Sequence, residues 1–494
     1  MISLMLIVLL IGSILSFAIG KREHSRIVAL VSTLLAFIIS LVMFIEMQEF
    51  DGMFAFEENL KWIPAAGISY HVGVDGISMP MVLLTTFVSF LCVVYAWEER
   101  LRSNQFFGLI VLLDFALVGV FTSLDFFLFY IFWELVLIPM FFVIGIWGGP
   151  RKDYSAIKFL IYTHVSSVIM LAGIFAIFYF NWVSTGKMTF DIPVLLNNYA
   201  AVEFPTIWRD FIFAALLFGF LVKMPAVPFH TWLPDAHVEA PTVGSILLAG
   251  VLLKMGGYGL VRFLVPMSLN ANEVFIAVIA IFGVISILYT PLAALPQRDL
   301  KRLVAFSSIG HMGFISLGVA ASLVSGDSSM RMLALTGATF QLFAHGVITS
   351  ILFGSAGVIQ HHTGTRLFEK LGGLMKPMPK FSFLMVLGFF ASMGFPGMVG
   401  FVAEFSVLAG ALSLMPVFAV LALISIPLSV IYHLYALQRT VFGTPANPLP
   451  KSDFHTYEMI PLLVWVVVTV IFGIYPAPVF EMIEKSISVM GVIP

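Results

Sequence analysis

Two lysines lie inside apolar stretches that are long enough to cross a membrane. Lys223 lies about fourteen residues after Arg209 in LLFGFLVKMPAVPFHTWLPDAHVEAP, and Lys254 lies in SILLAGVLLKMGGYGLVRF. Lys223 would therefore lie roughly 20 Å into a hydrocarbon layer about 30 Å thick. A charge at that depth costs about 2.5–3.5 kcal/mol even on lenient insertion scales. Gly256 and Gly257 allow close approach or hydration beside Lys254, where a desolvated lysine could exchange protons.

Proline residues interrupt two of the apolar stretches. Pro225 and Pro228 follow Lys223 at once, and Pro396 lies between Gly394 and Gly397 in SMGFPGMVGFVAEF. Proline has no backbone donor, so each helix must break or kink there. Non-helical backbone at membrane depth is tolerated only where protein covers it or where it lines a wet cavity. A buried charge beside a broken helix therefore predicts an ion pathway.

Acidic residues also occur inside the apolar stretches. Glu134 lies about ten residues from either end of its predicted span. An acid at that depth needs a cationic partner or becomes neutral, and Lys223 is the candidate partner. Glu404 follows the Pro396 break by about two turns, as Lys223 precedes the first break. Asp114 also lies mid-span, and structural and functional readings of it stay open.

Histidines could link these charges, because imidazole titrates near physiological pH and relays protons through water. His311 in FSSIGHMGFISLG and His345 in FQLFAHGVITS lie near the middle of their spans. A hydrogen-bonded packing role is the alternative for both residues. His164 is a weaker candidate, because it lies nearer the start of its span.

Another group of polar residues superficially resembles a metal site. His230, Asp235, His237 and Glu239 have a spacing that matches no standard zinc pattern, and a helix cap and loop anchor is the favoured reading. The single cysteine, Cys92, excludes a disulfide framework, an iron–sulfur cluster and a cysteine-type zinc site. No Walker motif or GxGxxG fingerprint occurs. We expect no metal or cofactor in this chain, so its energy would come from a neighbouring subunit or a gradient.

Composition places the chain in a membrane. It is 60% hydrophobic and 11% charged, with a mean hydropathy of +1.04. The first apolar run has a basic flank after it and no cleavage pattern, which predicts a retained first helix. We expect a multi-pass protein of a prokaryotic cell membrane, with no nucleic-acid partner.

The predicted fold class is an all-α polytopic membrane protein with about fourteen transmembrane helices, of which helices 7 and 12 are broken. The predicted spans are 2–20, 26–47, 77–97, 105–122, 124–147, 158–182, 208–238, 242–262, 272–296, 301–323, 331–360, 378–414, 415–438 and 458–479.

Loop charge predicts the orientation. Sixteen Lys and Arg residues fall on the side assigned as inside and six on the other side, which fits the positive-inside rule with both termini outside. The inside set includes Lys451 and the outside set includes Arg262.

A short internal repeat is visible. FLIYTHVSS from Phe159 matches FQLFAHGVITS from Phe340, and a proline break follows each copy. Five spans per copy would invert the second copy, as in many transporters. The predicted divisions are N-terminal helices (1–104), two inverted five-helix repeats (105–262 and 272–440) and a C-terminal helix (458–494).

The chain resembles the antiporter-like membrane subunits of respiratory complex I. The most specific strings are GVDGISMPMVLLTT, FWELVLIPM, KMPAVPFHTWLPDAHVEAPT, LLAGVLLKMGGYGL and GFVAEF. The broken twelfth span carries glutamate in the subunit M group, which includes mitochondrial subunit 4 and close archaeal and bacterial relatives. It carries lysine in the sister subunits L and N. Glu404 therefore favours the M group.

The resemblance implies a proton-translocating subunit of a redox-driven NADH:quinone oxidoreductase-type complex that itself holds no redox centre. It implies a Glu134–Lys223 pair and a polar axis that continues through Lys254, with His311, His345 and Glu404. Implied partners are neighbouring antiporter-like subunits and a redox-active peripheral arm. The electron donor stays open between NADH, ferredoxin and a reduced deazaflavin.

Two other functions remain open from the sequence. The first is a subunit of a multi-subunit sodium/proton antiporter. The second is a membrane subunit of an energy-conserving hydrogenase. Redox-active peripheral subunits that co-purify with the chain would argue against the antiporter.

Overall fold

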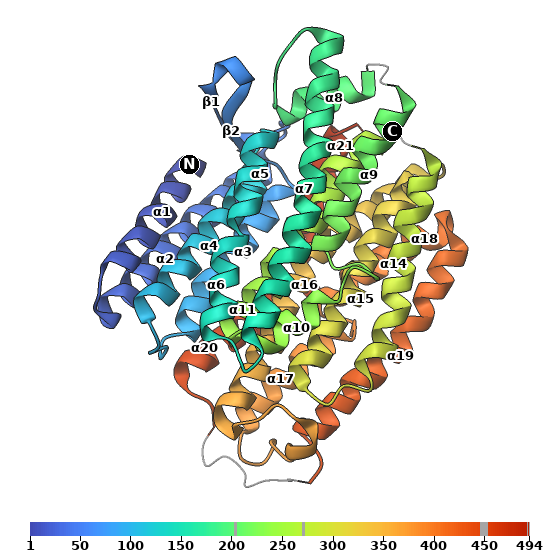
Figure 1. The fold of residues 1–494 in the computed structure, drawn as a ribbon. Coiled ribbons are helices and arrows are strands. Elements are labelled where there is room, and N and C mark those ends of the chain that lie inside the picture. The colour runs from blue at the N-terminus through green and yellow to red at the C-terminus, as the bar shows by residue number, and fades with distance from the viewer. Residues whose placement is uncertain (202–204, 269–271, 445–452, 492, 494) are drawn as a thin grey trace.

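The computed structural model describes residues 1–201, 205–268, 272–444, 453–491 and 493, and it shows a bundle of packed helices (Figure 1). The helices before the first break are α1 (Ile2–Ala18), α2 (Arg22–Glu46), α3 (Ser78–Tyr95), α4 (Ser103–Thr122), α5 (Phe126–Leu135), α6 (Leu137–Trp147), α7 (Lys152–Thr185), α8 (Ile192–Ala201) and α9 (Thr206–Lys223). The helices that follow are α10 (Trp232–Glu239), α11 (Thr242–Leu247), α12 (Lys254–Gly259), α13 (Val265–Met267), α14 (Glu273–Ala294), α15 (Leu300–Leu323), α16 (Ser328–Thr363), α17 (Pro379–Ser392), α18 (Val399–Leu414), α19 (Pro416–Thr440), α20 (Thr456–Ile474) and α21 (Ala477–Val489).

Eleven helical segments of the described residues are long and apolar enough to cross a membrane. Three shorter apolar helices, α1, α17 and α18, accompany them. A largely helical, polytopic membrane protein is therefore confirmed. Lys451 lies outside the described residues.

One part of the chain departs from the all-α prediction. Residues Ala55–Ile63 (β1) and Ile68–Val74 (β2) form an antiparallel hairpin, with Gly67 at φ 68° in the turn. The left-handed conformation there suits glycine, which has no Cβ. Alternating polar and apolar residues with aromatic and β-branched members favour strands in this segment, and the prediction missed that signal. We call this end of the bundle the hairpin end; the N-terminus and α21, the last described helix, lie toward it (Figure 1).

Both predicted helix breaks are present. α9 ends at Lys223 and α10 begins at Trp232, whereas α17 ends at Ser392 and α18 begins at Val399. The first break is covered by protein, because the Val227 N–H donates to Ser286 Oγ at 3.0 Å. Freed backbone groups thus find partners in neighbouring helices, as membrane burial requires.

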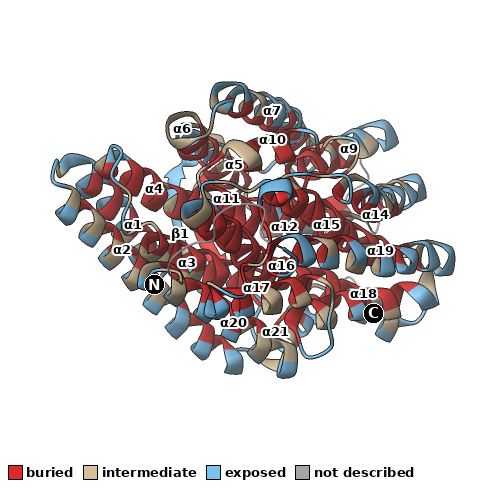
Figure 2. Ribbon diagram, turned by 90° about the horizontal axis from the view of Figure 1, so that it is seen from below, coloured by how far each residue is buried: buried red, intermediate tan, exposed pale blue. Residues whose placement is uncertain are grey.

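Three helical segments form the centre of the bundle. The 18-residue apolar windows of Thr242–Met267, α15 and α16 are 100% buried, whereas those of α2 and α19 are 39% and 28% buried. Figure 2 shows the same contrast between an enclosed centre and exposed flanking helices. The enclosed segments carry Lys254, His311 and His345, so the protein itself shields these groups from lipid.

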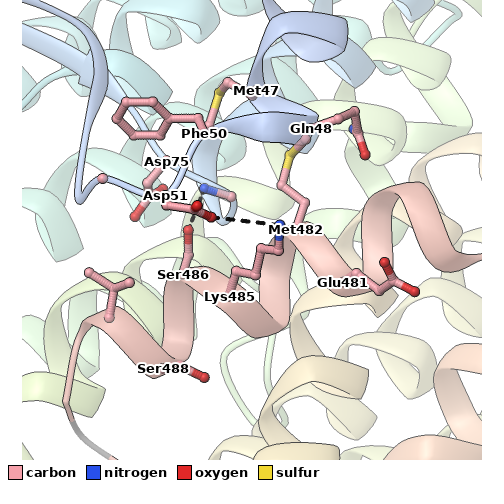
Figure 3. A pocket seen from close by; sticks show the side chains of 13 residues that line it. Met47, Gln48, Phe50, Asp51, Asp75, Glu481, Met482, Lys485, Ser486 and Ser488 are labelled. Carbon is pink, nitrogen blue, oxygen red and sulfur yellow. Dashed lines mark hydrogen bonds and ion pairs between the residues drawn. The ribbon is translucent and has the colours of Figure 1, made fainter.

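The hairpin end holds two features that the sequence prediction missed. The last predicted span, 458–479, is divided into α20 and α21, and α21 lines a pocket of about 290 Å³ with Asp75, Gly76 and Lys485 (Figure 3). Arg262 was assigned to an outside loop, which is wrong. It lies in a π-helical segment, Leu260–Leu264, is 4% exposed, and pairs with buried Asp75.

This pair explains the GVDGIS string. The Asp75 carboxylate accepts the backbone N–H groups of Ile77 and Ser78 at the start of α3 while it pairs with Arg262. Gly76 leaves no room for a side chain, because a Cβ there would meet the Met482 carbonyl at 1.9 Å. The motif therefore joins α3 to two distant helices.

Candidate functional site

Four of the six predicted site residues form one buried row, here called the central row. Lys254 Nζ lies 2.7 Å from His345 Nδ1. The rings of His345 and His311 lie 5.3 Å apart between centroids. His311 Nδ1 lies 2.6 Å from Glu404 Oε1. The row therefore crosses three helices of the bundle interior and ends on the broken helix α17–α18.

A local helix irregularity positions Lys254. It lies two residues after the end of the π-helical segment Leu248–Leu252, whose C-cap Leu253 donates its N–H to the Leu248 carbonyl at 3.1 Å. Lys254 Nζ also donates to the Ala249 carbonyl. π-bulges occur frequently at functional sites because they redirect backbone groups and side chains.

The glycines beside Lys254 allow close packing, as predicted. A Cβ on Gly256 would meet the Phe220 carbonyl at 2.5 Å, and one on Gly257 would meet Leu342 at 2.5 Å. The lysine helix therefore touches the end of α9 on one side and α16 on the other. This contact brings the two lysine-bearing helices together.

The second helix break shapes the far end of the row. The Ser392 hydroxyl, in the last residue of α17, lies 3.1 Å from His311 Nε2. Gly394 has φ +72°, and a Cβ there would lie 3.3 Å from a Glu404 carboxylate oxygen. A cavity of about 20 Å³ adjoins His311 and Glu404 and is also lined by hydroxyl side chains, including Ser425 and Tyr432. That volume suits about one water molecule.

Glu134 and Lys223, both among the described residues, form no hydrogen bond or ion pair with each other, so the predicted direct pair is wrong. Glu134 Oε2 lies 2.8 Å from Nδ1 of His164 instead. Lys223 Nζ finds no hydrogen-bond partner among the described residues and lies 5.3 Å from the Trp133 ring centroid. Glu134 still attracts Lys223 through space. We call Glu134, His164 and Lys223 the flank cluster.

A helix kink places Glu134 at the flank. α5 ends at Leu135 and α6 begins at Leu137. Pro139 cannot donate to the Leu135 carbonyl, which explains the interruption. The sequence analysis gave His164 little weight and did not foresee its contact with Glu134, although the repeat that aligns it with His345 was an available signal.

The flank cluster opens onto the side of the bundle. An open apolar groove of about 660 Å³ is lined by Glu134, His164 and neighbouring side chains of α5, α6 and α7. The His164 side chain is 55% exposed, whereas that of His311 is 8% exposed. The two sites thus share residue types and differ in enclosure.

The metal-like group after the first break is an anchor, as predicted. Asp235 pairs with Lys158 at 2.7 Å, and the Glu239 carboxylate accepts the Arg151 N–H at 2.9 Å. The His237 ring stacks on Phe353 at 4.3 Å, and neither ring nitrogen has a hydrogen-bond partner among the described residues. His237 also interacts electrostatically with Lys254, a proximity that the sequence analysis missed.

A polar vestibule opens at the end opposite the hairpin. It has a volume of about 740 Å³ and is lined by residues that include Glu98, Glu239, His361 and Glu458. Residues 238–241 form part of its lining. His237 is thus adjacent in the chain to the vestibule lining and is also within electrostatic reach of Lys254.

Asp114 belongs to neither site. It is fully buried on α4, and neither carboxylate oxygen has a hydrogen-bond partner among the described residues. An isolated buried carboxylate is costly in its charged form. The polar side chains that interact with it electrostatically are Cys92 and Ser89 on α3.

The hairpin end holds an ionic cluster outside the spanning helices. His71 contacts Asp191 at 2.7 Å and Glu57 at 2.9 Å. Burial lowers the pKa of His71, but the two carboxylates outweigh burial and the pKa is raised. Asp125, the N-cap of α5, accepts the Ser69 N–H at 3.0 Å. The hairpin is thereby joined to the helix that carries Glu134.

Known proteins resemble this chain along nearly its whole length. It is 43% identical over 488 residues to F(420)H(2) dehydrogenase subunit M of Methanosarcina mazei, which covers 98% of this chain and 96% of the relative. It is 38% identical over 476 residues to NADH-quinone oxidoreductase subunit M of Rhodobacter capsulatus, covering 94% and 90%.

Solved structures show the same fold. A chain of respiratory complex I from Thermus thermophilus with bound NADH superposes with a TM-score of 0.87 at 26% identity, and both chains are covered completely. The family model described as NADH:quinone oxidoreductase/Mrp antiporter, TM, matches residues 123–429. That range contains all six predicted site residues. The chain therefore belongs to the NADH:quinone oxidoreductase/Mrp antiporter transmembrane family.

Proposed function

We propose that this chain is the antiporter-like, proton-translocating subunit of a redox-driven quinone oxidoreductase-type complex. The observation that carries the proposal is the central row, in which Lys254, His345 and His311 lie on fully enclosed helical segments and His311 contacts Glu404 on α18. Buried titratable groups in a membrane mark proton paths, because their burial is costly without a function.

The row can pass a proton by short steps. Protonated Lys254 donates to His345 Nδ1, and the imidazolium then releases the proton from Nε2. A water-mediated step carries it to His311, because the two rings lie 5.3 Å apart between centroids and share no direct hydrogen bond. His311 then donates to Glu404. Each imidazole then holds its proton on the other ring nitrogen, so proton exchange through water must restore the starting tautomer before the next transfer.

The surroundings of the row supply an entrance and an exit. The vestibule and His237 would load Lys254 from the basic, inside face. The broken backbone beside Glu404 and its water-sized cavity would release the proton toward the outside. Unpaired buried polar atoms, including His345 Nε2, support hydration along this route.

The flank cluster would control the loading of Lys254. In the state described above, Glu134 binds His164 and leaves Lys223 without an acceptor. In a second state, Glu134 would turn to Lys223 and neutralise it. Moving that charge changes the field at Lys254, because α9 and α12 pack directly together.

The membrane arrangement that fits this function has fourteen spans, two inverted five-helix repeats and both termini outside a prokaryotic cell membrane. Supporting features are the two long helices, α7 and α16, each followed by a broken helix. The partners would be similar antiporter-like subunits at the flanks and a redox-active peripheral arm. The higher identity to the F(420)H(2) dehydrogenase subunit favours F420H2 over NADH as the electron donor of the complex.

The test uses the intact complex in inverted membrane vesicles. Lys254→Met keeps the length of the side chain and removes its charge, so proton uptake per electron transferred should fall strongly. Lys376→Met, at an exposed lysine, is the matched control. An unchanged ratio of protons to electrons in Lys254→Met would refute the proposal. Proton uptake that requires sodium and proceeds without any electron donor would favour the antiporter subunit instead.

A further inference from the structure

Three histidines and one glutamate meet at the end opposite the hairpin, outside both sites described above. His361 and His362 lie at the end of α16, and His455 is the residue before α20. One nitrogen from each imidazole lies within 4.8 Å of the others. Glu458, which is 2% exposed, lies beneath them. We propose that His361, His362 and His455 bind a divalent cation of the zinc class.

Glu458 prepares two of the rings for a metal. Its carboxylate oxygens lie 2.8 Å from His361 Nδ1 and 2.9 Å from His362 Nε2. A carboxylate accepts hydrogen bonds, so those nitrogens carry the protons and the opposite nitrogens keep their lone pairs. In known zinc sites, a ligand histidine binds the metal through one ring nitrogen and donates the N–H of the other to a carboxylate. That hydrogen bond orients the ring and makes it a stronger ligand.

The third ring must turn to complete the set. The His455 side chain accepts the Glu458 N–H as a helix cap, and Glu458 accepts the His455 N–H at 2.9 Å. His455 would exchange its cap bond for the metal. His361 and His455 are both exposed, so their rings can turn toward the about 3.3 Å nitrogen separation of a tetrahedral site.

The ligand chemistry selects the metal class. Three neutral imidazoles suit zinc, copper and nickel, whereas magnesium and calcium prefer oxygen ligands. Three histidines leave a fourth position for water, as in other open zinc sites. The chain offers no thiolate here, because its single cysteine is buried on α3. Zinc(II) is therefore the probe of choice.

The location gives the site a consequence. His361 and Glu458 line the vestibule, and α16 runs from this site to His345, sixteen residues earlier. If the vestibule loads the central row, which rests on the proposed function, a bound cation there would repel incoming protons and narrow the opening. Zinc would then slow proton uptake from this face.

The binding test uses the purified intact complex, equilibrated with buffered zinc(II). Bound zinc per complex is measured, and X-ray absorption at the zinc edge reports the ligand atoms. We expect one zinc site with about three histidine nitrogens. A His361→Ala/His455→Ala variant, which changes only exposed rings, should bind at least about tenfold more weakly. His24→Ala, at an exposed histidine of α2, is the matched control.

The outcomes separate binding from function. Equal zinc affinity in the double variant and the control, or a site without histidine nitrogens, would overturn the metal site. Glu458→Gln should weaken zinc binding by about 10–100-fold if the carboxylate orients the rings. Zinc that binds as proposed and leaves proton uptake unchanged would contradict the vestibule as the entry route and leave the metal site standing.

Discussion

The central row and the flank cluster use the same chemistry in opposite surroundings. Each has a lysine near an irregular helix, a histidine at the matching repeat position and a glutamate. In the central row, Lys254 contacts His345, and the His311 side chain is only 8% exposed. In the flank cluster, the His164 side chain is 55% exposed and Lys223 has no hydrogen-bond acceptor among the described residues.

The difference shows which site is held more firmly. Lys254, His345 and His311 lie on fully enclosed helical segments and are close neighbours there, which favours one arrangement. The flank cluster has an acid that can reach two bases and faces an open groove. A site with two available pairings is suited to switching, because a small change in charge decides between them.

The largest effect should come from cutting the central row. Glu404→Gln keeps the shape but cannot carry a proton onward from His311, so proton translocation should fall at least tenfold with normal assembly. Glu404→Asp should retain the most activity and Glu404→Lys part of it. Proton uptake per electron in vesicles measures this series. Normal translocation in Glu404→Gln would mean that protons leave by another route.

Removing the acid of the flank cluster should be almost as damaging. Glu134→Ala removes the hydrogen-bond partner of His164 and the negative charge that attracts Lys223. Stranding a buried charge costs about 3–5 kcal/mol or forces it to become neutral. We expect Glu134→Ala and Lys223→Ala each to abolish proton uptake in an assembled complex. Asp114→Asn, at a buried acid outside both sites, should retain uptake. Full uptake in Glu134→Ala would remove the proposed switch.

The two matching histidines give the sharpest comparison. His345→Ala opens a gap in a row with no alternative route, and translocation should be lost. His164→Ala removes only one of two partners of Glu134, which can then turn to Lys223. We therefore expect a several-fold loss, measured as the rate of proton uptake. An equal loss of proton uptake in His345→Ala and His164→Ala would contradict the proposed difference between the enclosed central row and the exposed flank cluster.

The smallest effect concerns how the hairpin holds the flank helix. The pKa of His71 is raised in the folded state, so its contribution to stability is fully present below its unfolded value of about 6.5 and is lost as pH rises through the folded value. The contact between the hairpin and the helix that carries Glu134 should therefore weaken as pH rises above the folded-state pKa of His71. Limited proteolysis of the hairpin as a function of pH measures this change, and His71→Phe should abolish the pH dependence. A pH dependence that persists in His71→Phe would assign it to another group.

Much of the site could be predicted from residue types alone. Charge inside apolar stretches is so costly that Lys223, Lys254, Glu134 and Glu404 had to be functional or paired. Proline chemistry predicted both helix breaks, and these lie where the sequence placed them. Helical structure followed from the apolar runs, because only hydrogen-bonded segments can cross a bilayer.

The tertiary structure decided which of these groups meet. Spacing along a helix cannot show that Glu134 contacts His164 across two helices, because that choice depends on the kink at Pro139 and the packing of α7. The Asp75–Arg262 pair joins positions 187 residues apart, and His361, His362 and His455 converge from two helix ends. Sequence determined which residues are costly to bury, and three-dimensional packing determined their partners, since contact distances arise only when distant segments fold together.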